Sequence, residues 1–108
     1  MSDYNVAILP RAEMDLATIS SWLHQRSPRG AANWLASFAE LVESLERDPE
    51  KFGIAPESPI LKCTLHQAIF KTRRGYNFRA VFIIDQSKVF ILRVRGPGQP
   101  PLQADEIE

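Results

Sequence analysis

Apolar side chains follow a strand-like and then a helix-like spacing in the first half of the chain. They alternate with their neighbours over residues 4–9, which predicts a short first strand. Pro10 ends this strand and suits the first turn of a helix, because the N–H that proline lacks would have no partner there. The predicted helix presents one apolar stripe, which consists of Ala12, Leu16, Ile19 and Leu23.

A second helix is predicted to begin at Ser27-Pro28, with the serine as N-cap and the proline as the first helical residue. It should end near Asp48-Pro49. Because only a few residues separate the two helices, we expect an antiparallel helical hairpin. The apolar face of the second helix consists of Ala31, Trp34, Leu35, Phe38, Val42 and Leu45. Its aromatic residues are expected to pack in the core rather than to bind a ligand.

The second half of the chain predicts a loop followed by three strands. Prolines and a glycine interrupt any helix over residues 49–61, which therefore form a connecting loop. Residues rich in β-branched and aromatic side chains then predict strands at Leu65–Thr72, Asn77–Asp85 and Val89–Val94. Beyond Gly96, residues 97–108 are expected to form a loose tail.

The order of these elements, β-α-α-β-β-β, predicts one α+β domain over residues 1–108. In this arrangement the helical hairpin packs on a small antiparallel β-sheet. The turn at Arg73-Arg74-Gly75 joins the first two strands of the second half, and Gln86-Ser87 joins the last two.

The Gln86-Ser87 turn leaves two registers open. A two-residue loop pairs Asp85 with Lys88 and places one apolar set under the helices: Val81, Ile83, Phe90, Leu92 and Val94. The opposite face would then mix arginines with large apolar groups in contact with solvent, as binding surfaces often do. That face consists of Phe78, Ala80, Phe82, Ile84, Val89, Ile91, Arg93 and Arg95. A loop one residue longer reverses the faces and puts Arg79 beside Arg93.

Charge is unevenly distributed, although the formal net charge is zero. Residues 1–58 hold five basic and nine acidic side chains, whereas residues 62–95 hold eight basic ones and a single acid, Asp85. This asymmetry indicates a basic surface that faces an anionic partner. Its candidate members are Lys71, Arg73, Arg74, Arg79, Arg93 and Arg95.

Several classes of function find no support in the sequence. No apolar stretch is long enough to span a membrane and no signal-peptide pattern is visible, so a cytoplasmic protein is expected. Cys63 is the single cysteine and cannot form an internal disulfide. Cys63 and His66 are not expected to act as nucleophile and base, because nearby pairs of this kind occur often by chance. We expect no metal and no cofactor, since neither a ligand cluster nor a glycine-rich phosphate loop is present.

Four segments resemble the RelE/ParE toxins of type II toxin–antitoxin systems. They read YNVAILPRAEMDL (residues 4–16), SLERDP (44–49), FKTRRGYNFRAVF (70–82) and VFILRVR (89–95). The first is similar to the family's opening strand and helix, and the second to the end of its second helix. The third and fourth resemble its basic hairpin and its last strand. The resemblance covers residues 4–99, which is nearly the whole chain.

The resemblance implies a toxin that a cognate antitoxin neutralises, with operator DNA contacted only through the antitoxin. ParE-like members poison DNA gyrase, whereas RelE-like members cut messenger RNA on the ribosome with a basic cluster and often a C-terminal tyrosine or histidine. Neither branch uses a metal or a cofactor. The antitoxin is expected to cover the mixed face of the last hairpin. Its candidate contacts are Phe78, Phe82, Ile84, Val89 and Ile91.

Departures from the family pattern favour the ParE-like branch. Gly96 stands where histidine is common, Gln99 stands where a basic residue is common, and no tyrosine follows Tyr76. RNA cleavage needs a base to activate the 2′-hydroxyl, and only His24 and His66 remain as candidates. Inhibition of DNA gyrase by binding, without catalysis, is therefore expected. The alternatives are a ribosome-dependent mRNA endoribonuclease and a weakened family member that acts mainly as an antitoxin-binding protein.

Overall fold

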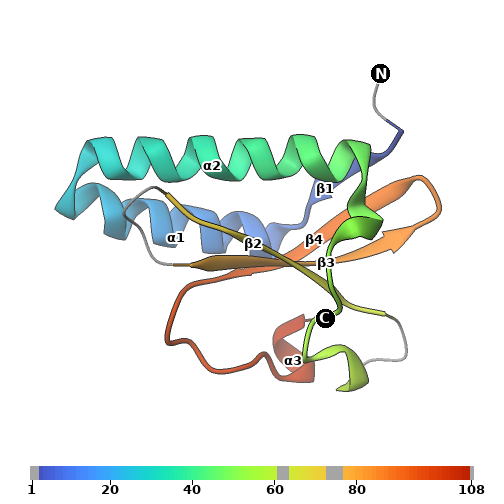
Figure 1. The fold of residues 1–108 in the computed structure, drawn as a ribbon. Helices are drawn as coiled ribbons and strands as arrows, with labels where there is room; N and C mark the ends of the chain where they lie inside the picture. Colours follow the sequence, from blue (N-terminus) through green and yellow to red (C-terminus); the bar gives the residue numbers. More distant parts are fainter. Residues whose placement is uncertain (1–2, 61–63, 73–76, 108) are drawn as a thin grey trace.

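The computed structural model describes residues 3–60, 64–72 and 77–107, and it places a helical hairpin on one face of a four-stranded sheet (Figure 1). The hairpin consists of α1 (Pro10–Arg26) and α2 (Pro28–Arg47), so Ser27 alone joins the two helices. The backbone N–H of Ser27 donates to the Leu23 carbonyl at 2.8 Å, and its side chain accepts from the Gly30 N–H at 3.0 Å. One residue thus caps the end of α1 and the start of α2, which confirms the predicted helix start.

The sheet contains β1 (Asn5–Ile8), β2 (His66–Phe70), β3 (Phe78–Asp85) and β4 (Lys88–Arg95), in the spatial order β1-β4-β3-β2. The element order β-α-α-β-β-β and the α+β class are confirmed. The sheet is mixed rather than purely antiparallel, because β1 runs parallel to β4. Parallel neighbours need a long connection between them, and the segment from α1 to β3 supplies it.

The β3–β4 hairpin has the predicted two-residue loop, with Asp85 opposite Lys88. Gln86 takes a positive φ of 56° at the first loop position, as type II′ turns require. The register then shifts between Val81 and Phe82, so that Val81 lies opposite Arg93 rather than Leu92. This β-bulge reverses the alternation of side chains along the rest of β4.

The inner face of the sheet packs against the helices and forms the larger core. Its buried members on β3 and β4 are Phe78, Ala80, Phe82, Val89, Ile91 and Val94. On α2 the buried side chains are Ala31, Trp34, Phe38, Leu41 and Leu45. The predicted stripe of α2 is therefore correct except at Leu35, which is 44% exposed, while Leu41 takes the place in the core.

The opposite side of the sheet, called the outer face here, is also covered. It carries Val81, Ile83, Phe90 and Leu92. The part of the loop that contains η2 (Ser58–Ile60) and the segment that ends in α3 (Ala104–Ile107) lie on this side in Figure 1. The short helix η1 (Pro49–Lys51) directly follows α2. The expected placement of the two hairpin faces is therefore wrong, because the set expected under the helices lies on the outer face, apart from Val94.

Residues 97–107, called the tail from here on, differ from the loose segment that was expected. Leu102 is 0% exposed and Ile107 is 5% exposed, and both pack in the outer cluster. The described helices include none that is long and apolar enough to cross a membrane.

Candidate functional site

Arg79 on β3 is held by a buried carboxylate from the loop before β2. Arg79 donates from Nη1 to Glu57 Oε1 at 2.8 Å, and its Nη2 donates to Glu57 Oε2. A third bond joins Nη1 to Gln67 Oε1 at 3.2 Å. Glu57 is only 1% exposed and also accepts from the Leu102 N–H at 2.9 Å. Through this carboxylate, the loop that contains Glu57 is hydrogen-bonded to Arg79 of the sheet and to Leu102 of the tail.

The hydrogen bonds to Glu57 outweigh its desolvation. Burial on its own raises the pKa of this carboxyl, but the bonds from Arg79 and from the Leu102 N–H lower it to about 2. Glu57 is consequently ionised at neutral pH and neutralises the charge of Arg79.

Arg93 on β4 is held in the same way by α1. Its Nε donates to Asp15 Oδ2 at 2.7 Å and its Nη2 donates to Asp15 Oδ1 at 2.9 Å. The hydrogen bond to Asp15 raises the pKa of Arg93, against the effect of burial. The Nη1 of Arg93 donates to the Glu106 carbonyl at 2.8 Å, so this guanidinium joins α1 to the tail.

Arg95 is buried under the tail with a less complete set of partners. Its Nη2 donates to the Pro100 carbonyl at 2.8 Å, and its Nη1 lies 3.9 Å from Glu106 Oε2. Within the described residues its Nε has no acceptor. The bulge places Arg95 opposite Arg79 across β3 and β4.

Of the remaining basic candidates, the structure describes only Lys71. Lys71 is exposed and follows β2, where its backbone carbonyl accepts from the Ser37 hydroxyl at 3.0 Å. Arg73 and Arg74 lie outside the described residues, as does Cys63. The structure thus brings three of the six basic candidates together, and all three have acceptors within the chain.

The five expected antitoxin contacts lie on the inner face of the sheet. Phe78, Phe82, Val89 and Ile91 are buried beneath the helices, and Ile84 is partly buried against the same core. Their expected exposure is therefore wrong, because the loop and the tail cover the other face while α1 and α2 cover this one. These positions therefore do not form the exposed apolar patch that was expected for antitoxin contact.

Neither histidine is placed as a catalytic base beside the arginines. His66 is half-buried and stacks on Phe82 with ring centroids 5.3 Å apart, and its Nδ1 lies 3.4 Å from the Phe52 carbonyl. His24 is exposed in the last turn of α1. No group of three metal-binding side chains occurs within the part of the chain that the structure describes.

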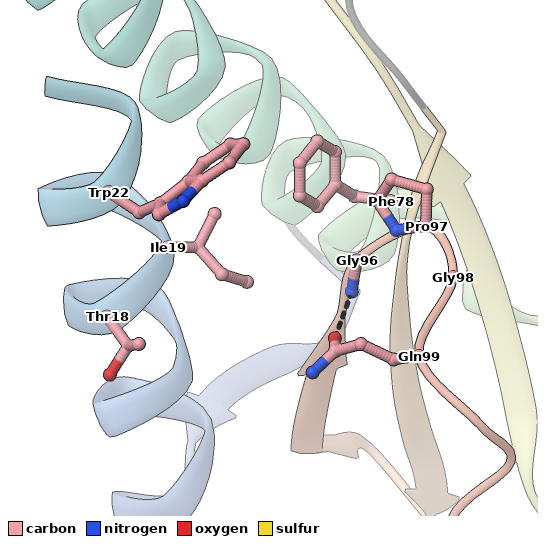
Figure 2. A pocket seen from close by; sticks show the side chains of 8 residues that line it. All are labelled: Thr18, Ile19, Trp22, Phe78, Gly96, Pro97, Gly98 and Gln99. Carbon is pink, nitrogen blue, oxygen red and sulfur yellow. Dashed lines mark hydrogen bonds between the residues drawn. The ribbon is translucent and has the colours of Figure 1, made fainter. Parts of the chain in front are cut away.

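An apolar pocket of about 600 Å³ opens between α1 and the segment that follows β4 (Figure 2). Thr18, Ile19 and Trp22 form one wall, and Phe78 together with residues 96–99 forms the other. Figure 2 shows the rings of Trp22 and Phe78 on opposite sides of this space. Trp22 is 46% exposed, and the guanidinium of Arg26 lies 3.9 Å from the centroid of its ring.

Both departures from the family pattern line this pocket. Gly96 lies against Phe78, and a Cβ at Gly96 would come within 3.3 Å of that ring. The Gly96 N–H donates to Gln99 Oε1, which holds the segment in a closed turn (Figure 2). Where the family pattern places histidine and a basic residue, this chain has backbone and an amide beside apolar rings.

Sequence reasoning missed the acidic partners of the arginines. Asp15 and Glu57 belong to the acidic first half of the chain, and only the fold brings them to the basic second half. The charge asymmetry was a signal for such pairing as well as for an anionic partner. Leu102 and Ile107 were missed because prolines and acids surround them in the tail.

Comparison with known proteins shows the family of the chain. No curated protein matches the chain. The family model for the ParE toxin of the type II toxin–antitoxin system, parDE, matches residues 6–99. That region contains α1 and α2, the strands β2, β3 and β4, and β1 apart from Asn5. It also contains the three ion-paired arginines and the walls of the pocket. The chain therefore belongs to the ParE toxin family of type II toxin–antitoxin systems.

Proposed function

We propose that this toxin inhibits DNA gyrase by binding to it and does not catalyse a reaction. The observation that carries this proposal is that intramolecular acceptors occupy the arginines of the sheet. Arg79 is bound by Glu57 and Arg93 by Asp15, in each case through two nitrogens of the guanidinium.

A ribonuclease would use these residues differently. Cleavage of RNA requires cations that stabilise charge on the phosphate and a base that activates the 2′-hydroxyl. A guanidinium that already binds a carboxylate has little capacity left for a phosphate. At the positions where the family pattern places polar or basic groups, Gly96 and Gln99 bind each other. These features favour binding of a protein target over RNA chemistry.

The family implies an antitoxin partner, and we place its contact at the pocket between α1 and residues 96–99. Trp22 is one of the large apolar side chains that remain exposed in the described residues. Exposed apolar surface beside a pocket is typical of protein–protein contacts, and aromatic residues contribute most to their affinity. This location replaces the hairpin face that the sequence had suggested.

Two assays with the purified full-length toxin test the proposed target. We expect loss of DNA supercoiling by gyrase, restored by the antitoxin, and no cleavage of messenger RNA on translating ribosomes. In cells, induction should cause filamentation and a DNA-damage response. Codon-positioned cuts in messenger RNA, with gyrase unaffected, would overturn the proposal in favour of an endoribonuclease. Unimpaired growth with a folded protein would indicate a weakened member that mainly binds its antitoxin.

A further inference from the structure

The tail lies largely beyond the region that defines the family. The family match ends at residue 99, whereas the buried anchors Leu102 and Ile107 follow it. These anchors pack on an apolar floor that belongs to the matched region. The floor consists of Ala55, Leu65, Val81 and Leu92. A segment beyond the matched region therefore covers a face of that region.

The tail also provides acceptors to the cations beside this floor. The carbonyl of Glu106 accepts from Arg93, and the carbonyl of Pro100 accepts from Arg95. The tail itself is acidic, with Asp105 and Glu106 in α3. The covered surface thus combines an apolar floor with a cationic edge, and the tail is its chemical complement.

One contact of the tail is incomplete. Arg95 is only 7% exposed, yet the nearest carboxylate among the described residues, that of Glu106, lies 3.9 Å away. The Arg95 Nε has no acceptor among the described residues. A buried guanidinium without its full set of hydrogen bonds is unfavourable. A segment that brought a carboxylate closer to Arg95 would therefore bind this face better than the tail does.

The connection between β4 and the first anchor is exposed. Residues 97–101 are exposed, and Gly98 has a φ of +79° in the left-handed region. These residues lie between the end of β4 and the first anchor, Leu102. Rotation within this connection would lift the anchors while β4 keeps its pairing with β3.

We propose that the outer face is an interaction surface for an acidic, amphipathic segment of a partner protein, and that the tail occupies this surface in cis. The segment would carry two apolar side chains five positions apart, like Leu102 and Ile107, and a carboxylate that reaches Arg95. The apolar floor selects a peptide over a nucleic acid. This inference goes beyond the inhibition of gyrase and does not depend on it.

Binding of a labelled peptide with the sequence of residues 97–108 tests the proposal. Fluorescence anisotropy would measure its affinity for the full-length chain and for Ile107→Ser and Leu102→Ala variants, whose own tails are less firmly seated. We expect these variants to bind the peptide at least tenfold more tightly than the wild-type chain. A matched control, Gln103→Ser, changes an exposed tail position and should bind like wild type. A peptide with serine in place of both apolar anchors should not bind.

Equal binding by all folded variants, or binding by none, would overturn the proposal. So would binding of single-stranded RNA, but not of the peptide, to the released face. Circular dichroism shows whether each variant is folded. If neither anchor variant folds, the wild-type chain still gives an answer by NMR. With excess peptide, the Leu102 amide should lose its protection from hydrogen exchange, because its bond to Glu57 breaks. Unchanged protection would refute displacement of the tail.

Discussion

Asp15 of α1 binds Arg93 of β4 through both of its carboxylate oxygens. Oδ2 accepts from Arg93 Nε at 2.7 Å, and Oδ1 accepts from Nη2 at 2.9 Å. Asp15 Oδ2 also accepts from the Val94 N–H at 2.9 Å. A single carboxylate therefore holds both the side chain and the backbone of β4. The two charged side chains are only 14% and 15% exposed, so solvent screens the pair weakly.

Replacement of Asp15 by asparagine should destabilise the fold. The amide of Asp15→Asn offers one acceptor instead of two and leaves Arg93 partly buried without its counter-charge. We expect the free energy of unfolding, measured by urea titration, to fall by about 2 kcal/mol. Glu43→Gln makes the same chemical change at an exposed position of α2 and should alter it by less than about 0.5 kcal/mol. Equal values for the two variants would show that the contact contributes nothing.

Glu57 should make the free energy of unfolding depend on pH in the acidic range. The pKa of Glu57 is lowered from 4.5 to about 2 on folding, so the folded state binds its proton less readily than the unfolded state. Its contribution to stability is then fully present above pH 4.5 and is lost as the pH falls towards 2. From the size of the shift, this contribution is on the order of 3 kcal/mol.

Urea titrations between pH 7 and pH 2 check the effect of Glu57. The Glu57→Gln variant should be less stable than wild type at pH 7 and should approach it as the pH falls to 2, because wild-type Glu57 then becomes neutral as well. A constant difference between the two proteins across this range would contradict the assignment of the low pKa to Glu57.

The helical hairpin could be predicted from sequence because its signals are local. Ser27-Pro28 marks a helix start because serine caps the first turn and proline suits its first position. The apolar stripe of α1 repeats at the spacing of a helical turn. In α2, Leu35 was expected to be buried but is exposed, and Leu41 is buried instead. Which side of the helix is buried depends on the elements against which it packs. The contacts of α2 with the sheet therefore decide which of its side chains are buried.

The faces of the β3–β4 hairpin could not be predicted, because both are buried. The alternation of residues along a strand assigns the side chains to two faces of the hairpin. When both faces are apolar, it does not indicate which face packs against the helices. The bulge at Val81 and Phe82 has no clear signal in the sequence, and it moves Val94 to the inner core. Of the six basic candidates, Arg79, Arg93 and Arg95 lie together on β3 and β4. The long-range partners Asp15 and Glu57 depend on the tertiary fold.

The stability of the fold should require a residue without a side chain at Gly96. A Cβ at this position would come within 3.3 Å of Phe78, whose ring is confined by Trp34 at a centroid distance of 5.3 Å. Because the ring has little room to move, Gly96→Ala should lower the free energy of unfolding by about 1 kcal/mol. Gly53→Ala is the matched control, since a Cβ there meets nothing within 4 Å, and it should be neutral or slightly stabilising. A Gly96→Ala protein as stable as the Gly53→Ala protein would mean that Phe78 moves aside.

Trp22 should contribute more to antitoxin affinity than to the stability of the isolated toxin. Its ring is 46% exposed at the mouth of the pocket, so Trp22→Ser removes limited core packing but a large apolar contact surface. We expect calorimetric titration with the purified antitoxin to show at least a tenfold loss of affinity, or about 1.4 kcal/mol. Met14→Ser alters another exposed apolar residue of α1, 69% exposed and outside the pocket lining, and should leave the affinity unchanged. If both variants bind the antitoxin like wild type, the antitoxin contact lies elsewhere on the toxin.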